Sequence, residues 1–333
     1  MKVAIVRLTA MGDVIHTLSA LQFVKRAQPD TEITWFVESK FAQILENSLD
    51  IDNIVPVNLH RFKSSFSLSA LKDEVRKVRE SGPFDLVIDV QGLVKSAVLA
   101  RIAGRMVAGL DYDSAKEGVA SFLYSERFRV DCSETAPYRF ASLIASALKT
   151  EITKEMLLKK SPYLIYEETE ECEEISGYFE ESAKNVLIVT GASNESKTYP
   201  PEKFAEVAGR LEGCNVLLVA GSERERESAA KIEESSSARL LPRMSLNGLK
   251  YAVSRCDLLI GGDTGPSHMA WAMNRPSLLL FGSTPRSMMM ETPVNIALTS
   301  GAKVHPCRFD RSDRSITKID PAEVARTALE LLS

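Results

Sequence analysis

The sequence predicts an α/β protein of two doubly wound domains, each with a parallel sheet covered by helices. Short apolar runs alternate with amphipathic stretches along the chain, which is the pattern of repeated β-α-β units. The same alternation is present in both halves of the chain. The chain has 333 residues, and domains of about 100–200 residues predict two of them.

In the first half, the apolar runs predict buried strands, and the stretches between them predict helices. Ile15, Leu18, Leu21 and Val24 have the spacing of one helix face. The expected strands span residues 3–6, 33–37, 54–57, 84–90 and 107–109. The expected helices span residues 13–27, 41–46, 71–80, 94–103 and 138–148.

The second half repeats the pattern. Pro201 and Pro266 suit the first turn of a helix, where the missing N–H is not needed. We expect strands at residues 185–190, 216–220, 257–260 and 277–281, and helices at 201–211, 223–234, 246–253, 266–273 and 321–332. The junction falls in the charge-dense stretch 150–183, so the expected domains are residues 1–160 and 161–320, followed by a final helix in 321–333.

Composition excludes several classes of protein. The 41 basic and 45 acidic residues give a net charge of −4, which argues against a general nucleic-acid binder. Five scattered cysteines with no CxxC pair predict neither a disulfide framework nor a zinc site, and fit a reducing cytoplasm. No apolar run is long enough to span a membrane, and the N-terminus turns polar too early for a signal peptide. Association with a membrane surface stays open.

Two loops stand where ligands bind in doubly wound sheets, beyond the carboxyl ends of strands. Residues 9–13 (TAMGD) follow the first strand, and Gly12 would allow a tight turn there. Asp13 then either caps the next helix or acts as a general base. Residues 261–268 (GGDTGPSH) follow a strand of the second half, and their backbone N–H groups would form an anion site beside His268.

Other loops at strand ends add polar and basic groups. Thr190 and Ser193 follow the first strand of the second half, and Lys197 could meet a phosphate as a point charge. Glu223 follows the next strand and suits a ribose diol. In the first half, Arg61, Lys63 and Lys95 could bind an anion.

Several common signatures are absent. No GxGxxG follows the first strand, which counts against a dehydrogenase-type dinucleotide site. Residues 191–198 only imitate a P-loop, because the glycine before the lysine is lacking. Asp111 and Asp113 form a DxD triplet that some metal-dependent glycosyltransferases use, but a match this short arises readily by chance, and we expect no metal.

Taken together, these loops resemble the lipopolysaccharide heptosyltransferases of glycosyltransferase family 9. The resemblance covers almost the whole chain, and the ordered set of segments is far more specific than any one of them. The matching segments are residues 11–18, 35–38, 89–96, 111–117, 241–246 and 263–268. The run QGLVKS at 91–96 looks most like the members that add the first heptose.

The resemblance implies a GT-B architecture, in which two Rossmann-like domains face each other across a cleft and the last helix packs back on the first domain. It implies inverting, metal-independent transfer of heptose from ADP-heptose to the Kdo of Kdo-lipid A, with no cofactor. Such an enzyme would be cytoplasmic and peripheral on the inner-membrane surface. The expected alternatives are a later-acting heptosyltransferase, another GT-B sugar-nucleotide enzyme such as an epimerase, and a sugar-nucleotide-binding module without catalysis.

The same resemblance implies roles for individual residues. Asp13 matches the proposed base and Lys197 the lysine that neutralises the leaving diphosphate. The residues expected to bind the donor are Thr190, Ser193, Glu223 (with Glu225 as a rival), Met244, Asp263, Thr264, Gly265 and His268. The residues expected to bind the acceptor are Thr9, Arg61, Lys63, Gln91, Lys95 and Asp111.

Overall fold

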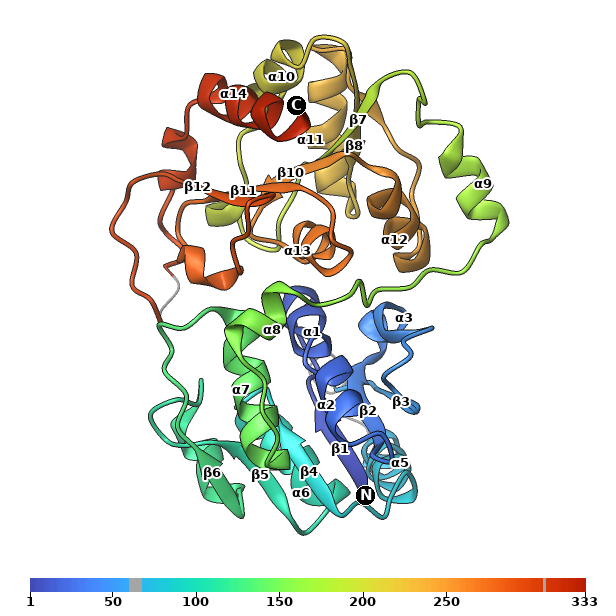
Figure 1. The fold of residues 1–333 in the computed structure, drawn as a ribbon, viewed down its shortest axis with the longest axis vertical. Helices are drawn as coiled ribbons and strands as arrows, with labels where there is room; N and C mark the ends of the chain where they lie inside the picture. Colours follow the sequence, from blue (N-terminus) through green and yellow to red (C-terminus); the bar gives the residue numbers. More distant parts are fainter. Residues whose placement is uncertain (60–67, 308–309) are drawn as a thin grey trace. The chain divides into compact units, whose positions relative to one another are not determined.

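The computed structural model describes residues 1–59, 68–307 and 310–333. The chain divides into two compact units, residues 1–163 and 164–333. Within the described residues, each unit contains one six-stranded sheet with helices on both faces (Figure 1). Two domains of the α/β class are therefore confirmed, and the division lies close to the expected one at residue 160.

The sheet of the first unit has the order β3-β2-β1-β4-β5-β6, and all its strand pairs are parallel. The strands are β1 (Lys2–Val6), β2 (Glu32–Glu38), β3 (Asn53–Val57), β4 (Leu86–Asp89), β5 (Val107–Leu110) and β6 (Glu126–Phe128). The helices are α1 (Met11–Leu18), α2 (Leu21–Ala27), η1 (Ser39–Phe41), α3 (Ala42–Leu45), α5 (Leu68–Glu80), α6 (Val94–Ala103), η2 (Gly118–Leu123), α7 (Ala136–Leu148) and α8 (Lys154–Leu158).

The sheet of the second unit has the order β12-β11-β10-β7-β8-β9, again with parallel pairs. The strands are β7 (Lys184–Val189), β8 (Cys214–Val219), β9 (Arg239–Leu240), β10 (Leu258–Gly262), β11 (Ser277–Phe281) and β12 (Asn295–Thr299). The helices are α9 (Glu170–Ser176), η3 (Glu195–Lys197), α10 (Pro201–Arg210), α11 (Glu223–Glu234), α12 (Leu246–Arg255), α13 (Gly265–Ala272), η4 (Arg286–Met288), η5 (Ser315–Lys318) and α14 (Pro321–Leu332).

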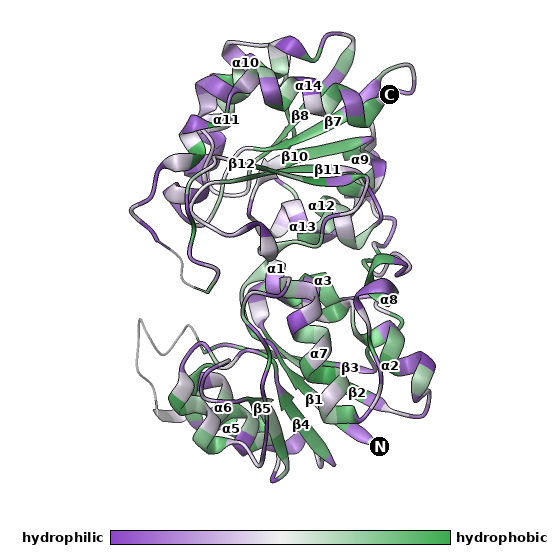
Figure 2. Ribbon diagram, turned by 60° about the vertical axis from the view of Figure 1, so that its left-hand side comes forward, coloured by the Kyte–Doolittle hydropathy of each residue, from purple (hydrophilic) through white to green (hydrophobic). Residues whose placement is uncertain are grey.

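The central strands of both sheets are buried and largely apolar. In β1 the four residues after Lys2 are fully buried, and all five residues of β10 are buried. Figure 2 shows these strands in the hydrophobic colour, whereas the outer faces of the helices are hydrophilic. A parallel sheet covered on both faces needs strands that are apolar throughout, which explains why the strands read as continuous apolar runs.

One expected helix is two helices. The apolar spacing over residues 13–27 is real, but the chain breaks between α1 and α2 at Ser19 and Ala20. The Ser19 hydroxyl donates to the carbonyl of His16 at 2.7 Å, and the N–H of Ala20 bonds to Thr17, three residues back. Such local bonds compete with the helical ladder and tighten its last turn.

The final helix α14 differs from its expected position. Its apolar face, with Val324, Ala325 and Ala328, is buried. It packs against α10, β10 and β11 of the second unit, whose core it joins. The amphipathic pattern therefore predicted the helix correctly, but the helix packs on the second unit rather than back on the first.

Both sheets have the same topology. In each, the first strand of the unit (β1 or β7) lies between the second and the fourth, so the strand order reverses beside it. Ligands of doubly wound folds bind at the carboxyl ends of strands at this reversal. The loops after β1 and β4, and those after β7 and β10, are among those that the sequence singled out. No helix among the described residues is long and apolar enough to cross a membrane.

Candidate active site

The second unit holds a buried carboxylate between two basic side chains. Asp263 directly follows β10 and its side chain is only 4% exposed. One carboxylate oxygen lies 2.5 Å from Lys197 Nζ, and the other lies 2.9 Å from His268 Nε2. The predicted catalytic Lys197 and two predicted donor-binding residues, Asp263 and His268, are thus brought together at the carboxyl-end side of β7 and β10.

The charge of Asp263 depends on its neighbours. Burial on its own would raise the pKa of this carboxyl, because a low-dielectric surrounding disfavours the anion. The positive charge of Lys197 and the hydrogen bond to His268 outweigh that effect, and the pKa of Asp263 lies well below its ordinary value. The carboxylate therefore stays ionised and keeps Lys197 and His268 in fixed positions.

The N-terminus of α13 lies beside this carboxylate. Thr264 is the N-cap residue, Gly265 begins the helix and Pro266 stands second, one position later than predicted. The hydroxyl of Ser267 is buried and has no hydrogen-bond partner among the described residues. A helix N-terminus carries unsatisfied N–H groups and a partial positive charge, which favour a phosphate.

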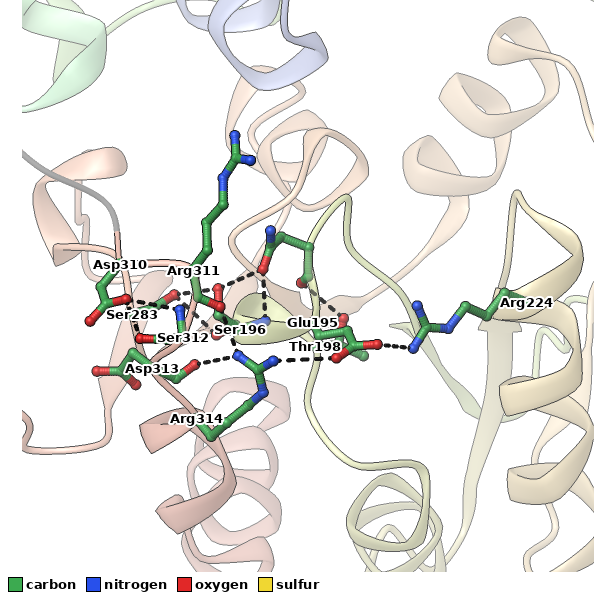
Figure 3. Close-up of polar contacts among 11 residues, drawn as sticks. Glu195, Ser196, Thr198, Arg224, Ser283, Asp310, Arg311, Ser312, Asp313 and Arg314 are labelled. Carbon is green, nitrogen blue, oxygen red and sulfur yellow. Dashed lines mark hydrogen bonds and ion pairs between the residues drawn. The ribbon is translucent and has the colours of Figure 1, made fainter.

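The short helix η3 places Lys197. Asn194 caps it through Ser196, whose N–H and hydroxyl both lie within 3.1 Å of Asn194 Oδ1. The hydroxyl of Ser283, from the loop after β11, lies 3.0 Å from both oxygens of the buried Ser196 (Figure 3). A Cβ on Gly262 would collide with the backbone carbonyl of Lys197, so β10 and η3 can approach only because this residue is glycine.

Next to η3 lies a polar pocket of about 470 Å³. Glu195 pairs there with Arg224 of α11 and with Arg314, which lies 3.3 Å away (Figure 3). Of the predicted donor residues, Thr190 and Ser193 line the pocket. The hydroxyl of Thr190 donates to the carbonyl of Val219 at 3.1 Å, so towards a ligand its oxygen can only accept a hydrogen bond.

The two candidate ribose carboxylates differ in position. Glu225 lines the pocket, accepts the N–H groups of Gly221 and Ser222 at 2.8 and 2.9 Å, and packs against Gly191. Glu223 is 71% exposed and pairs with Arg243. Met244 is half-buried. The pocket thus favours the rival Glu225, because Glu223 already has a basic partner at the surface.

In the first unit, Asp13 is paired with a buried cation. Asp13 is the third residue of α1, and Ala10 rather than Asp13 is the N-cap residue; Gly12 lies inside the helix. Arg7, only 5% exposed, forms an ion pair with the Asp13 carboxylate and donates to the carbonyl of Val90 at 2.8 Å. Its guanidinium also lies 4.4 Å from the ring centroid of Phe140.

A second arginine acts on the same carboxylate. Burial lowers the pKa of Arg139 on α7, while the charge of Asp13 opposes this shift and that of Arg7 adds to it. In the described part of the chain, the Nε atoms of Arg7 and Arg139 are buried without a hydrogen-bond partner. Neither arginine was predicted from the sequence. The position of Arg7, directly after the first strand, was the available signal.

The remaining predicted acceptor residues are found in three places. Gln91 links the loop after β4 to the loop after β1. Its side chain accepts a hydrogen bond from the Leu8 N–H at 2.8 Å and donates one to the Thr9 hydroxyl at 3.1 Å. Lys95 is exposed at the start of α6, and Asp111 accepts the Ser114 N–H at 2.9 Å. Arg61 and Lys63 lie outside the described residues.

No three His, Cys, Asp or Glu side chains in residues 1–59, 68–307 and 310–333 are grouped as ligands for a metal ion. Two sheets of order 3-2-1-4-5-6, each with polar loops at its strand reversal, define the class of two-domain nucleotide-binding α/β proteins. A buried cation–carboxylate–histidine cluster beside a helix N-terminus suits a phosphorylated ligand within that class.

Comparison with known proteins makes the assignment specific. Residues 73–312 match glycosyltransferase family 9 (heptosyltransferase). A lipopolysaccharide heptosyltransferase 1 from Campylobacter coli is 33% identical, over 99% of each chain, and that of Escherichia coli strain K12 is 30% identical over 85% of this chain and 88% of its own. The E. coli heptosyltransferase WaaC, solved with ADP-2-deoxy-2-fluoro heptose, has 25% identity, 99% coverage of each chain and a TM-score of 0.78.

The chain therefore belongs to glycosyltransferase family 9, and it is a glycosyltransferase with the GT-B fold of the solved heptosyltransferases.

Proposed function

We propose that this glycosyltransferase transfers L-glycero-D-manno-heptose from ADP-heptose to the Kdo of Kdo-lipid A, with inversion and without a metal, in the inner core of lipopolysaccharide. The observation that carries the proposal is the buried Asp263, which joins Lys197 and His268 beside the N-terminus of α13. The relatives named above are lipopolysaccharide heptosyltransferases, and the solved neighbour holds an ADP-heptose analogue.

The second unit binds the donor in this proposal. The diphosphate lies at the N-terminus of α13, with Thr264 and Gly265 supplying backbone N–H groups and Lys197 a positive charge. The ribose diol is bound by Glu225 in the polar pocket, and Met244 contacts the adenine. A fixed cation and helix-end N–H groups stabilise the charge that develops on the leaving diphosphate, so no divalent ion is required.

The first unit binds the acceptor. Asp13 is the general base, and the cations Arg7 and Arg139 hold its carboxylate in place and attract an anionic sugar acid. Thr9 and Gln91, hydrogen-bonded to one another, orient the acceptor hydroxyl, while Lys95 and Asp111 contact its outer part. Arg61 and Lys63 remain proposed contacts from outside the described residues.

The transfer is a single displacement at the anomeric carbon. The acceptor oxygen forms a bond to that carbon as its proton passes to the Asp13 carboxylate. The bond between the anomeric carbon and the phosphate oxygen breaks, and its electron pair leaves with ADP. Attack from the face opposite the leaving group inverts the anomeric configuration. Because the acceptor is lipid-linked, the enzyme works as a peripheral protein on the cytoplasmic face of the inner membrane.

The test is ADP release from ADP-heptose by the purified protein in excess EDTA. Kdo-lipid A, heptosyl-Kdo-lipid A and no acceptor are compared, and the anomeric configuration of the product is read by NMR. The proposal predicts that ADP is released only when Kdo-lipid A is the acceptor, and that EDTA does not diminish this release. Release only with the heptosylated acceptor would indicate a later-acting enzyme, and release without any acceptor would contradict transfer altogether.

A further inference from the structure

The first unit carries an exposed apolar patch on α6, on η2 and on the loop that precedes η2. The patch consists of Val94, Val98, Tyr112, Val119 and Phe122, each at least 40% exposed. On the opposite side of α6, Ala97 and Ala100 are fully buried in the core. A helix that is apolar on two sides is expected to be covered on both, so the outer side of α6 lacks its partner.

The members of the apolar patch lie together rather than scattered. Helix α6 packs against η2, and the N–H of Val94 donates to the carboxylate of Glu117, next to η2, at 2.7 Å. The rings of Tyr112 and Phe122 lie 6.1 Å apart. Two valines from α6 and three side chains from residues 112–122 therefore form one surface.

Exposed basic residues outnumber exposed acidic residues on the segments that carry the apolar patch. Lys95, Arg101 and Arg105 are exposed, and residues 94–106 contain no acidic residue although the whole chain has a net charge of −4. The guanidinium of Arg127 lies 6.0 Å from the ring centroid of Phe122. Among residues 112–127, Asp113, Glu117 and Glu126 are exposed acidic residues, and the carboxylate of Glu117 accepts the backbone N–H of Val94. Apolar side chains with an excess of lysine and arginine beside them fit the interface of an anionic lipid layer.

The apolar patch also borders the residues assigned to the acceptor. The carbonyl of Gly92, next to Gln91, accepts the N–H of Glu117 at 3.0 Å, and Lys95 follows Val94 directly. We propose that the apolar patch docks this enzyme on anionic lipid, with its valines and aromatic rings at the headgroup boundary and its basic residues on lipid phosphates. The choice of a lipid partner rests on the proposed function, because a lipid-linked sugar must be reached at the membrane surface.

The test is co-sedimentation of the full chain with vesicles of phosphatidylethanolamine and phosphatidylglycerol, or of phosphatidylcholine alone, with neither donor nor acceptor present. Wild type should bind the anionic vesicles and be released by salt. Val98→Ser with Phe122→Ser should lower the partition coefficient at least about tenfold, since two apolar anchors are lost. Arg101→Gln with Arg105→Gln should also weaken it. Leu49→Ser removes another exposed apolar side chain, 86% exposed in the same unit but outside the apolar patch, and should have no effect.

Transfer to a Kdo acceptor freed of its acyl chains is measured in parallel, and the Val98/Phe122 variant should retain it at the wild-type rate. Vesicle binding does not require heptose transfer, so a failure of the docking proposal can be distinguished from a failure of the proposed transfer activity. The docking proposal is overturned if wild type does not bind the anionic vesicles, or if the serine variant binds them undiminished. It is equally overturned if sedimentation velocity shows self-association that the serine variant abolishes.

Discussion

Lys197 Nζ lies 2.5 Å from a carboxylate oxygen of Asp263, and both side chains are largely buried. A second Lys–Asp pair, Lys184 and Asp257, lies at the opposite ends of β7 and β10, with its charged atoms 4.0 Å apart and its side chains 56% and 37% exposed. The same two strands thus carry one pair at each end. Only the pair at the carboxyl ends is short, buried and next to a helix N-terminus, and the two pairs make a matched comparison.

Replacing Lys197 tests its role towards the leaving group. Lys197→Met removes the charge while keeping a long side chain, and we expect kcat to fall about 10²–10³-fold, as for loss of one charge-stabilising donor. The affinity for ADP should also fall. Steady-state ADP release and calorimetric titration with ADP measure the two effects. Lys184→Met should behave as wild type in both, and an equal loss there would show that general charge, not position, matters.

The stability contributed by Asp263 should depend on pH in a defined direction. Because its pKa is lowered in the folded protein, its contribution is complete above the ordinary carboxyl pKa of about 3.9 and is lost as pH falls below that value. At neutral pH, Asp263→Asn should cost about 3 kcal/mol of unfolding free energy, since it leaves a largely buried ammonium without its carboxylate. Urea unfolding at a series of pH values measures the difference.

That difference should shrink as pH falls below about 4, because the carboxyl then takes up a proton in the unfolded chain of wild type, which favours unfolding, while the folded carboxylate is protonated only at still lower pH. Asp257→Asn, in the longer and more exposed pair, should cost only about 0–1 kcal/mol at any pH. A difference for Asp263→Asn that stays constant through the acid range would contradict the lowered pKa.

The strands that could be predicted from sequence are those buried on both faces. The central strands β1 and β10 each contain an unbroken apolar run. The structure confirms the strand positions predicted from these runs. The edge strands β6 and β9 were missed, since only one of their residues (Phe128 or Leu240) is a large apolar side chain. β12 was missed as well, although its apolar residues pack on the core. The element against which α14 packs could not be predicted either, because apolar periodicity identifies the buried face of a helix but not its packing partner.

Asp13 is expected to matter for chemistry more than for ligand binding. Asp13→Asn keeps the shape of the side chain but cannot accept the acceptor proton, so kcat should fall about 10²–10⁴-fold. ADP affinity should be unchanged. The control is Asp131→Asn, which removes another carboxylate that acts on Arg139 but is not at the end of β1. If Asp13→Asn turns over normally, the carboxylate only pairs with Arg7.

Ser283 is expected to act through η3. Its hydroxyl is buried and contacts Ser196, whose neighbour is Lys197. Ser283→Ala removes about 1 kcal/mol of hydrogen bonding, so we expect about a fivefold loss of kcat/KM for the donor. Ser254→Ala, which loses only a bond within its own helix, should leave the donor kinetics unchanged. An equal effect of both variants would indicate a general loss of stability instead.

The candidate site was predicted from loops that follow strands, and this logic predicts Asp13, Lys197, Asp263 and His268 as its residues. It did not find Arg139, which comes from α7 and reaches Asp13 only through tertiary packing. Nor could it choose between Glu223 and Glu225. Both follow β8, and only the fold shows that Glu225 packs on Gly191 while Glu223 pairs with Arg243.

Gly262 should be among the least replaceable residues of the second unit. An added Cβ would meet the backbone carbonyl of Lys197, which cannot move without displacing η3. Gly262→Ala should therefore destabilise the fold by about 1–3 kcal/mol, as overpacking does, and should also lower donor turnover. Gly209 in α10 is the matched control, because its added Cβ would meet nothing within 4 Å.

In a helix, replacing glycine by alanine stabilises by about 0.5–1 kcal/mol. Gly209→Ala should therefore raise the free energy of unfolding, whereas Gly262→Ala should lower it. The same glycine-to-alanine change thus has opposite effects on stability at two positions of one unit. Urea unfolding with ADP release measures both. A neutral Gly262→Ala would mean that η3 can shift away from β10, and the fixed position of Lys197 argued above would then be incorrect.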